Sequence, residues 1–397
     1  MRVLHLISSV SPICGGPTHA VLGACRSLRA RGVQAVIATT NAHMCDTVPL
    51  GECVEWEGVP VYFFAHQSPP MYAFSCGLTR WLRHNVRHFD VVHTHSVFSY
   101  CTSAGSFYAR KYGVPYIVAP EGTLDWYPLR KSAFRKRIYL ALIERRLLQG
   151  AAALDFKSAF EQKAADALGL PVPPVVIPIG VSQPEVVSTD LVTAFRKRYR
   201  LDGRLTLLSL SRLDPIKGLE LVIEALAKLR VQNHFRLLIA GSGAKAYEKT
   251  LRGLVDARGL QSVVDFVGLL QGQDKEAALA SADAFVLSSY HENFGIAVAE
   301  ALQAGLPVLV SDRVGLSSLV HQSGSGLVTE CSPDQIASGL LRMAEDETLR
   351  RKMGENGRQV AKQQFDWNTI AEQIIAVYND VTRGNKATRV PEAVLNS

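Results

Sequence analysis

Hydrophobic residues along this chain gather in short continuous runs that alternate with longer segments of helical spacing. Runs rich in β-branched residues are typical of strands buried on both faces, and the segments between them suit the crossover helices of a parallel sheet. The pattern therefore predicts an α/β fold with helices on both faces of the sheet. In the first half, the predicted strands are residues 3–8, 34–39, 59–64, 91–95, 116–119, 153–156 and 175–177.

A segment rich in proline divides the chain near its middle. Residues 171–185 hold five prolines together with Gly180, a density that interrupts regular structure and is typical of a connection between domains. The alternating pattern then starts again. The predicted strands are 205–210, 236–240, 264–267, 284–287 and 307–310, and the predicted helices are 217–230, 245–258, 274–280, 295–304, 334–344 and 368–381.

The length of 397 residues suits two domains of ordinary size. We expect a first domain over residues 1–183 and a second over 184–365. A C-terminal helix over 366–382 is expected to cross back to the first domain, and the tail over 383–397, which lacks periodicity, to be disordered. Ligands of such sheets bind at the carboxyl ends of the strands, so a site is expected in a cleft between the two domains.

The composition is that of an ordinary globular protein, with 47% hydrophobic and 20% charged residues. The long uncharged run at residues 58–79 contains three prolines, so no membrane span is predicted there. The first residues enter a strand without the apolar core of a signal peptide, and we expect a cytoplasmic protein. Seven cysteines without a C-x-x-C pair favour free thiols over disulfides or a zinc site.

Positive charge is concentrated in the first half of the chain. Residues 1–180 contain 18 Lys and Arg against 11 Asp and Glu, whereas the remainder contains 25 of each. A solvated helix face is the usual explanation; the alternative is a peripheral contact with an acidic acceptor or with the inner face of an anionic membrane. Nucleic acid is not an expected partner. The basic residues are Arg80, Arg83, Arg87, Arg130, Lys131, Arg135, Lys136, Arg137, Arg145 and Arg146.

Two adjacent glycines, Gly15 and Gly16, follow the first predicted strand and precede a helix predicted at residues 17–31. Glycine lets the backbone approach a ligand closely, and the amide groups at the start of a helix attract phosphate. A plain tight turn would use the same residues. The spacing is not G-x-G-x-x-G, so the fingerprint of nicotinamide-dinucleotide binding is absent.

Two cations, Arg212 and Lys217, lie on the loop after the strand predicted at 205–210. Arginine can grip two phosphate oxygens in a fork and lysine acts as a point charge, so the two side chains could neutralise one anion together. The alternative is a surface salt bridge to Asp214 or Glu220.

Two glutamates bracket the start of the helix predicted at 295–304. Glu292 can accept hydrogen bonds from sugar hydroxyls, and the amides of residues 294–297 can stabilise a diphosphate oxygen. Glu300, on the same helix face as Ile296, can reach a ribose diol. In the alternative interpretation Glu292 caps the helix and Glu300 is a solvated charge, although its sequence neighbours are apolar.

Together these patterns resemble the retaining GT-B glycosyltransferase family known as GT4, over residues 2–382. The resemblance implies two Rossmann-like, doubly wound domains that face a central cleft. It also implies a nucleotide sugar as co-substrate and no separate cofactor. The residues that carry the resemblance are Gly15-Gly16, Arg212 and Lys217, Glu292-x-Phe-Gly with Glu300, and Ala304-Gly305-Leu306-Pro307-Val308.

The resemblance also implies roles for these residues. Arg212 and Lys217 would neutralise the donor diphosphate. Glu292 would hold the transferred sugar, Glu300 the ribose, and the backbone at 268–269 the base. No metal ion is expected, because the chain has no Asp-x-Asp and preorganised charge would stabilise the leaving group instead. The expected donor-binding residues are Gly15, Gly16, Arg212, Lys217, Gly268, Leu269, Glu292, Asn293, Phe294, Gly295, Ile296 and Glu300.

The acceptor side is expected in the first domain. His93 is expected to pack within the sheet, and His95, nearer the strand end, to lie in the active site. Glu121 stands where many members of the resembled family carry a histidine; it could bind a sugar hydroxyl or pair with a nearby arginine. We assign no nucleophile, and an inverting reaction would need Glu121, Asp125 or His95 as its base. The expected catalytic residues are Arg212, Lys217, Glu292, His95 and Glu121.

The expected function is transfer of a hexose, glucose from UDP-glucose, with retention of anomeric configuration. The acceptor would be a polysaccharide or lipid-linked oligosaccharide, as in exopolysaccharide biosynthesis. UDP-galactose, UDP-N-acetylglucosamine and GDP-mannose stay open, the last as in a mannosyltransferase of the same fold. A nucleotide-sugar epimerase, a phosphorylase and a non-catalytic nucleotide-sugar-binding subunit are further alternatives, against which the continuous match through Glu300 argues.

Overall fold

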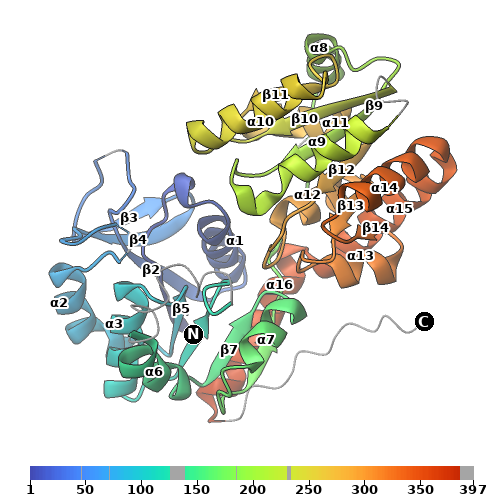
Figure 1. Ribbon diagram of the computed structural model, residues 1–397. Helices are drawn as coiled ribbons and strands as arrows, with labels where there is room; N and C mark the ends of the chain where they lie inside the picture. The colour runs from blue at the N-terminus through green and yellow to red at the C-terminus, as the bar shows by residue number, and fades with distance from the viewer. Residues whose placement is uncertain (46, 71, 126–138, 185, 230–233, 385–397) are drawn as a thin grey trace. The chain divides into compact units, whose positions relative to one another are not determined.

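The computed structural model divides the chain into two compact units (Figure 1). The first unit comprises Met1–Gly180 and a C-terminal segment that begins at Trp367, and the second comprises Val181–Asp366. The basic run at 130–137 and the tail beyond 384 lie outside the residues that the structure describes. The described residues are 1–45, 47–70, 72–125, 139–184, 186–229 and 234–384.

The described part of the first unit contains an eight-stranded sheet in the order β3-β4-β2-β1-β5-β6-β7-β8. Its strands pair in parallel, except that β3 and β4 form an antiparallel hairpin. The strands are β1 (Arg2–Leu6), β2 (Gln34–Thr40), β3 (Cys53–Trp56), β4 (Val59–Phe64), β5 (Val91–His95), β6 (Tyr116–Ala119), β7 (Ala153–Phe156) and β8 (Pro174–Val176).

Two hydrophobic cores lie on opposite faces of this sheet. On one face Leu22 and Leu28 of α1 pack with Tyr378 of α16, so the end of the chain completes this core. On the other face Leu78 of α2 and Leu148 of α6 belong to the second core. The helices are α1 (Gly16–Ala30), α2 (Cys76–Asn85), α3 (Tyr100–Lys111), α6 (Arg145–Gln149), α7 (Ala159–Asp166) and α16 (Trp367–Thr382), with a π-helix at Leu140–Glu144.

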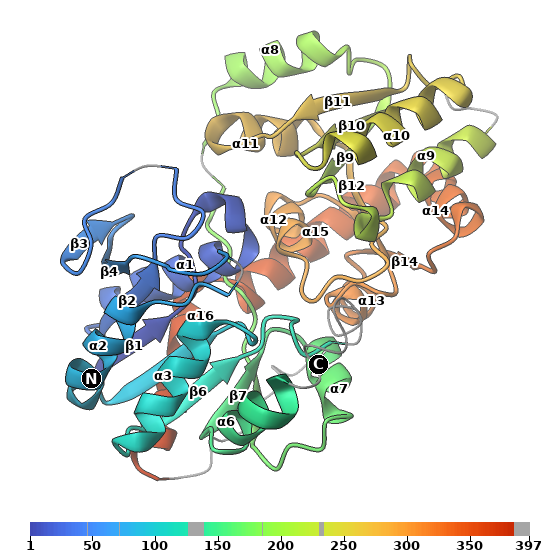
Figure 2. The same ribbon diagram turned by 60° about the vertical axis from the view of Figure 1, so that its left-hand side comes forward.

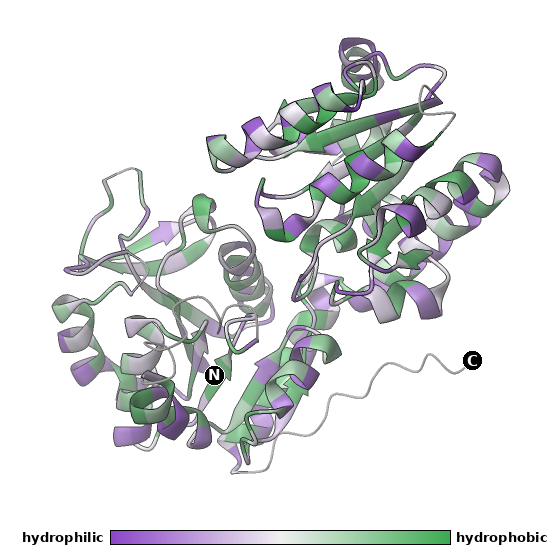
Figure 3. Cartoon of the chain, viewed as in Figure 1, coloured by the Kyte–Doolittle hydropathy of each residue, from purple (hydrophilic) through white to green (hydrophobic). Residues whose placement is uncertain are grey.

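The described part of the second unit contains a six-stranded parallel sheet in the order β11-β10-β9-β12-β13-β14. Its strands, which Figure 3 shows as largely hydrophobic, are β9 (Leu205–Leu210), β10 (Phe235–Ala240), β11 (Val264–Gly268), β12 (Ala284–Leu287), β13 (Val308–Ser311) and β14 (Gly326–Thr329).

Helices cover both faces of the second sheet as well. α9, α10 and α14 share a core on one face, and α11 and α12 lie on the other (Figure 2). The helices are α8 (Thr189–Tyr199), α9 (Leu219–Lys228), α10 (Lys245–Ala257), α11 (Gly272–Ser281), α12 (Ile296–Ala304), α13 (Ser317–Ser323), α14 (Pro333–Glu345) and α15 (Glu347–Gln364).

In both sheets the chain begins at a central strand, adds strands on one side, and then adds strands on the other. The reversal lies between β1 and β5 in the first unit and between β9 and β12 in the second. This is the doubly wound order, and ligands bind such sheets at the carboxyl ends of the strands beside the reversal. The predicted fold class is confirmed; a cleft between the two units stays a prediction.

The helix predicted over 217–230 begins later than expected, as α9 at Leu219. Gly218 precedes it with a φ of 61°, a left-handed conformation that interrupts a helix. A Cβ at Gly218 would also lie 2.3 Å from the carbonyl oxygen of Ser288, so only glycine allows this approach. The start of α9 is therefore held against the loop that follows β12.

Candidate functional site

The loops that follow β9 and β10 are in backbone contact at the carboxyl edge of the second sheet. The amide of Leu213 donates to the carbonyl of Ser242 at 2.9 Å. A Cβ at Gly241 would lie 1.8 Å from the carbonyl oxygen of Ser211, and one at Gly243 would lie 2.0 Å from that of Leu213. These two glycines, which the sequence patterns did not single out, let the loop that carries Arg212 pack closely over β10.

The loop after β12 fixes the other side of the same segment. The amide of Tyr290 donates to the carbonyl of Ile216 at 2.8 Å, and the Ser288 hydroxyl donates to the carbonyl of Gly218 at 2.7 Å. Because β9 and β12 flank the reversal in strand order, these bonds join the two loops at the place where doubly wound sheets bind ligands.

Lys217 and Glu292, which lie on these two loops, form an ion pair. Their side chains are 14% and 20% exposed, so the pair is partly accessible to a ligand. The alternative partners considered for the loop cations are engaged elsewhere. Asp214 accepts from the amide of Ile216 at 3.0 Å, and Glu220 accepts from the Tyr247 hydroxyl at 2.7 Å. The salt bridge to Asp214 or Glu220 is therefore wrong for Lys217.

Arg212 is exposed at the same edge. Within the residues that the structure describes, its guanidinium forms no ion pair with a carboxylate. An arginine whose five N–H donors are not held by a protein carboxylate can bind phosphate oxygens without first breaking a salt bridge.

The start of α12 presents backbone amides beside Glu292. Gly295 precedes the helix with a φ of 101° and supplies no capping side chain. The amides of Val298 and Ala299 donate to the carbonyl of Gly295, whereas those of Ile296 and Ala297 have no partner among the described residues. Orphan amides at the N-terminus of a helix attract an anion. Phe294 is buried, with its ring edge-on to Phe365, so only its backbone faces this site.

Glu300 lies on α12 and forms an ion pair with Lys275 of α11 at 2.9 Å. The two side chains are 19% and 28% exposed, so Glu300 is a partly buried, paired carboxylate and the solvated charge of the alternative interpretation is wrong. The sequence patterns did not find Lys275, because it is the one basic residue of α11, between Asp274 and Glu276, and its partner is 25 residues away.

The strand β11 contributes the backbone that was expected to read a base. Gly268 has a φ of 79°, and its carbonyl accepts from the amide of Gly241 at 2.8 Å. The next residue, Leu269, is 61% exposed, which leaves an apolar side chain uncovered at the end of this strand.

In the first unit, Gly15 and Gly16 lie at the start of α1, after a 3-10 turn at Pro12–Cys14. Gly15 has a φ of 67°, and a Cβ there would meet no atom within 4 Å. The glycine is therefore required by its backbone conformation, and the space above it is open to a ligand.

His95 and Glu121 are bonded to each other at the carboxyl edge of the first sheet. His95 Nδ1 lies 2.9 Å from Glu121 Oε1, and the Ser96 hydroxyl donates to Glu121 Oε2 at 3.0 Å. Their side chains are only 4% and 5% exposed. The pairing of Glu121 with an arginine is therefore wrong, and His95 lies beneath the edge of the sheet as the partner of Glu121. Both Ser96 and Glu121 have left-handed φ values, of 67° and 52°.

A buried chain of hydrogen bonds continues from His95 into the sheet. His95 Nε2 lies 3.0 Å from His5 Nδ1, and His5 Nε2 lies 3.3 Å from the Tyr378 hydroxyl of α16. That hydroxyl lies 2.8 Å from His93 Nδ1, and His93 Nε2 lies 3.4 Å from Asp155 Oδ2. His93 is therefore buried in the sheet, as expected, but as one member of a polar network. His5 and Tyr378 were not predicted.

Burial keeps His93 and His5 of this network neutral. It lowers the pKa of His93 to about 4 and that of His5 well below its ordinary value. Burial alone would raise the pKa of Asp155, but Lys157, which donates to it at 2.6 Å, and the neighbouring His93 together outweigh burial, so the pKa is lowered. Neutral imidazoles cannot satisfy every contact at once, because the Tyr378 hydroxyl has one proton and two imidazole neighbours. If His95 Nδ1 donates to Glu121 and His5 Nδ1 to His95, that hydroxyl donates either to His5 Nε2 or to His93 Nδ1, and one contact of the chain stays without a proton.

The same imidazoles are the group in the described chain that could ligate a metal ion. Nitrogen atoms of His5, His93 and His95 lie within 4.8 Å of one another, and all three residues are buried. Both nitrogens of His93 face a protein partner, and Nδ1 of His95 faces Glu121. The buried Lys157 ammonium adds positive charge beside them, which would repel a bound metal ion. A hydrogen-bonded role therefore suits the three imidazoles better than metal binding.

Comparison with known families accounts for most of the chain. Residues 192–360 match the family described as Glycosyl transferases group 1, and residues 15–180 match the Glycosyl transferase 4-like domain. The chain belongs to the group 1 glycosyltransferase family. Each unit of this group 1 family member thus corresponds to one of the two matched domains.

The names of the relatives of this group 1 family member differ in whether they specify a sugar donor. A GDP-mannose-dependent phosphatidylinositol monomannoside mannosyltransferase of Mycobacterium tuberculosis is 31% identical over 62% of this chain and 65% of its own length. An uncharacterised glycosyltransferase of Methanocaldococcus jannaschii is 33% identical over 45% of each chain. The chain therefore matches less than two thirds of the length of these relatives.

Solved structures share the fold of this family member over nearly its whole length. The Anabaena protein HepE, solved with UDP and glucose, superposes with a TM-score of 0.76 at 21% identity, over 94% of this chain and 98% of that protein. Sucrose-phosphate synthase of Thermosynechococcus elongatus gives a TM-score of 0.78 at 20% identity, over 97% and 100%. These likenesses support the GT-B arrangement of two Rossmann-like domains.

None of the helices in the described residues of this family member has the length and apolar character needed to cross a bilayer.

Proposed function

We propose that this family member transfers glucose from UDP-glucose to a polysaccharide or lipid-linked oligosaccharide, with retention and without a metal ion. The observation that carries the proposal is the meeting of Lys217, Glu292 and the start of α12 beside the strand reversal of the second sheet. Doubly wound sheets bind nucleotides at this position, and a pyrophosphate needs the positive charge that collects there.

The cations and the helix start would stabilise the leaving diphosphate. An ammonium group has three N–H donors, so Lys217 can keep its bond to Glu292 and still donate to a phosphate oxygen. Arg212 would hold further oxygens in a fork, and the amides of Ile296 and Ala297 would donate hydrogen bonds to the remaining phosphate oxygens. These groups are fixed before the reaction begins, and preorganised charge of this kind lowers the barrier to bond cleavage.

The two glutamates would hold the sugar parts of the donor. Glu292, placed by its pair with Lys217, would accept from hydroxyls of the transferred hexose. Glu300 keeps one oxygen on Lys275 and has acceptor capacity left for the ribose diol. The base would lie against Gly268 and Leu269.

The remaining expected contacts with the donor are made by main-chain groups. They come from the backbone at Gly15, Gly16 and Asn293, and no side chain of these residues is required.

Retention would follow from attack on the same face that the diphosphate leaves, with a donor phosphate oxygen taking the acceptor proton. Glu121, oriented by His95, would position a hydroxyl of the donor or acceptor. NMR of freshly formed product tests this proposal. We expect the anomeric configuration of the donor to be kept and the rate to be unchanged by EDTA. Inversion would require a general base and would overturn the assignment.

The HepE complex with UDP and glucose supports UDP-glucose as donor. The GDP-mannose dependence of the mycobacterial relative supports a second candidate, a mannosyltransferase of the same fold. Thermal shift with a panel of nucleotide sugars separates them, because a donor at about 100 times its dissociation constant adds about 2.7 kcal/mol of stability. A larger shift with GDP-mannose than with UDP-glucose would favour the mannosyltransferase. Binding without transfer or hydrolysis of any donor would favour a non-catalytic subunit.

We also propose that the protein is cytoplasmic and contacts an anionic membrane peripherally through its basic first unit. Support comes from exposed arginines on α2, on the turn after it, and on α6: Arg80, Arg83, Arg87, Arg145 and Arg146. Exposed cations on one unit attract acidic lipid surfaces, at about 1 kcal/mol per residue.

A further inference from the structure

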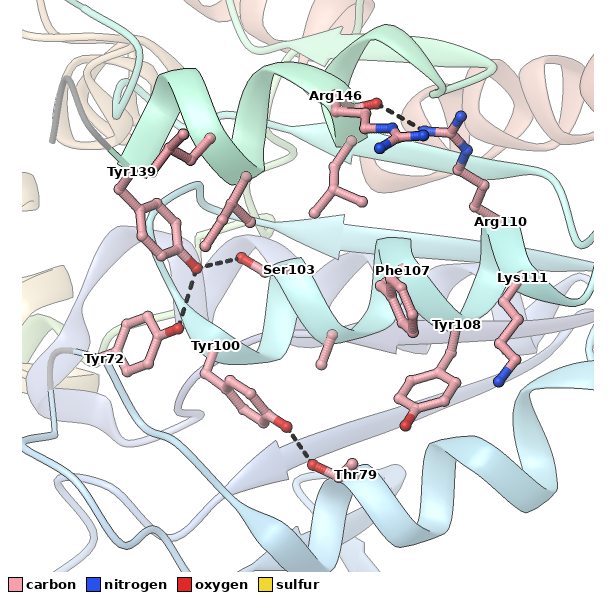
Figure 4. A pocket seen from close by; sticks show the side chains of 14 residues that line it. Tyr72, Thr79, Tyr100, Ser103, Phe107, Tyr108, Arg110, Lys111, Tyr139 and Arg146 are labelled. Atoms are coloured by element: carbon pink, nitrogen blue, oxygen red, sulfur yellow. Dashed lines mark hydrogen bonds between the residues drawn. The ribbon is translucent and has the colours of Figure 1, made fainter.

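A groove of about 750 Å³ runs along α3 of the first unit, between that helix, α2 and the segment from Tyr139 to Leu147 (Figure 4). Its walls are mainly aromatic and aliphatic. Three large apolar side chains on this groove are exposed to solvent: Phe107 by 53%, Leu142 by 74% and Ile143 by 41%. Large apolar side chains exposed together on one face mark a contact with another molecule.

One end of the groove is closed by tyrosines whose hydroxyls are bonded within the protein. The Tyr139 hydroxyl lies 2.8 Å from the Ser103 hydroxyl and 3.2 Å from that of Tyr72 (Figure 4). The Tyr100 hydroxyl is bonded to Thr79. With their polar atoms satisfied in this way, the rings offer the groove an apolar surface.

The other end of the groove is basic. Arg110, Lys111 and Arg146 line it and are exposed (Figure 4), and Arg145 is exposed beside them. In the part of the chain that the structure describes, none of these four cations forms an ion pair with a carboxylate. Arg110 instead donates to the carbonyl of Arg146 at 3.2 Å. Glu144, the acidic residue of the neighbouring π-helix, is buried and bonded to Ser103. The face therefore carries positive charge that no described acidic residue pairs with.

We infer that this groove docks on an anionic phospholipid bilayer, with one acyl chain in the groove and the lipid phosphate at Arg110, Lys111 and Arg146. The inference deepens the peripheral contact proposed above and assigns it a surface. Exposed Phe, Leu and Ile side chains bordered by arginine and lysine match the acyl chains and phosphates of a bilayer surface. A free phosphate or nucleotide would use the cations and leave the apolar groove without a role.

Vesicle flotation of the full chain tests the inference. We expect the protein to float with phosphatidylcholine vesicles that contain phosphatidylglycerol, and much less with phosphatidylcholine alone. Replacing Arg110, Lys111 and Arg146 together by Gln should lower the partition constant about 100-fold, since each cation near an anionic surface contributes about a factor of five. A matched control replaces Arg29, Lys163 and Arg383, three exposed cations of the same unit outside the groove, and should change it less than threefold.

The apolar part of the inference needs its own variant. Phe107→Ser with Leu142→Ser keeps the charge and should lower the partition constant at least tenfold, including in about 1 M salt, where charge attraction is screened. For the acyl chain, Phe107→Trp should add fluorescence that phosphatidylglycerol with a doxyl label on its chain quenches. Equal flotation of groove and control variants would overturn the inference, as would wild-type protein that stays off anionic vesicles.

The outcome can be separated from that of the proposed reaction. Thermal shift with UDP, without vesicles, reports donor binding and also shows that each variant is folded. If the protein floats with vesicles but binds no donor, the lipid-docking inference is supported and the proposed transferase reaction is contradicted. If the protein binds a donor but never floats, the transferase reaction is supported and the lipid-docking inference is contradicted. If heparin removes the protein from vesicles equally in groove and control variants, the contact is one of charge alone and the groove has no part in it.

Discussion

In the first unit the ionisable side chains near the carboxyl edge of the sheet are buried and bonded to one another, whereas in the second unit they remain partly accessible. The side chains of His95 and Glu121 are 4% and 5% exposed. Those of Lys217 and Glu292 are 14% and 20% exposed, and Arg212 is exposed outright. Both edges belong to doubly wound sheets with the same kind of reversal, so the topology does not cause the difference.

The difference indicates different roles for two domains that share one topology. Burial removes water from a charged group at considerable cost in free energy, so His5 and His93 of the first unit stay neutral and hold side chains in position. The second unit leaves its cations partly in water, where they stay charged and can meet an anion. We therefore expect substitutions in the second unit to change donor binding, and substitutions in the network of the first unit to change stability.

The largest effect is expected from Lys217→Ala. The substitution removes a cation from the proposed diphosphate site and leaves Glu292 without its partner. We expect kcat/KM to fall at least 100-fold, or about 3 kcal/mol, which is the usual loss when one preorganised donor is removed. UDP affinity, measured by calorimetry, should fall at least tenfold.

Lys228→Ala is the matched control for this prediction. Lys228 is another lysine of the second unit that pairs with a carboxylate, that of Asp334, and its side chain is 47% exposed. Its removal should change UDP affinity less than twofold, because exposed ion pairs contribute little. Equal effects of the two substitutions would show that net charge, and not the position of Lys217, governs donor binding.

A smaller effect is expected from acid, and it should be confined to the first unit. The pKa of His93 is about 4 in the folded protein, against about 6.5 for an exposed imidazole. Between these values the unfolded chain binds more protons, so the unfolding free energy falls as the pH falls from about 6.5 to 4. His5 acts in the same direction. His93 alone would lose about 3 kcal/mol over this window, at about 1.4 kcal/mol per pKa unit, and the opposing carboxyl of Glu144 makes the net loss smaller.

Glu144 opposes this loss and provides a way to sharpen the measurement. Burial raises its pKa to about 7, so its contribution to stability is full below the unfolded value near 4.5 and is lost as the pH rises to 7. In Glu144→Gln the acid-induced loss should therefore be larger than in the wild type. All four tryptophans fall in the sequence of the first unit, so tryptophan fluorescence during urea unfolding reports that unit alone. In Glu144→Gln, a transition that does not move between pH 6.5 and 4 would contradict the neutral network.

Apolar runs were enough to predict the central strands and hence the doubly wound fold. Elements without such runs were missed. The buried face of α15 includes Gly354 and Gly357, where a Cβ would lie 2.2 Å from the carbonyl oxygen of Gly305 and 2.9 Å from the side chain of Leu302. Glycines placed for close packing carry no hydrophobic signal, so the helix left no periodic pattern. The strand β3 was missed because Cys53–Trp56 alternates and lies at the edge of the sheet.

Individual residues of the candidate site could be predicted from the local pattern of a single loop. Contacts between residues that folding brings together could not be predicted. Lys217 and Glu292 were each found from their local pattern, but their pairing needs the packing of two loops 75 residues apart. His5 is one polar residue in an apolar strand, and its meaning appears only when β1 pairs with β5 and sets it opposite His93. Tyr378 could be identified only from the structure, in which α16 packs against the first sheet and places the hydroxyl beside His93.

The smallest effect is expected from Tyr378→Phe, which separates the network from the donor site. The substitution keeps the ring in its core and removes the hydroxyl 2.8 Å from His93 Nδ1, leaving that buried nitrogen without its hydrogen-bond partner. We expect the unfolding free energy of the first unit to fall by about 1–2 kcal/mol, measured by urea unfolding with tryptophan fluorescence. Tyr112→Phe is the control, because the hydroxyl of this partly buried tyrosine has no hydrogen bond within the described chain; it should change stability by less than about 0.5 kcal/mol.

UDP affinity should stay within twofold of wild type in both variants, since the proposed diphosphate site belongs to the other unit. A Tyr378→Phe protein that loses UDP affinity and keeps its stability would mean that the buried network takes part in donor binding, and the division between the two units would be wrong.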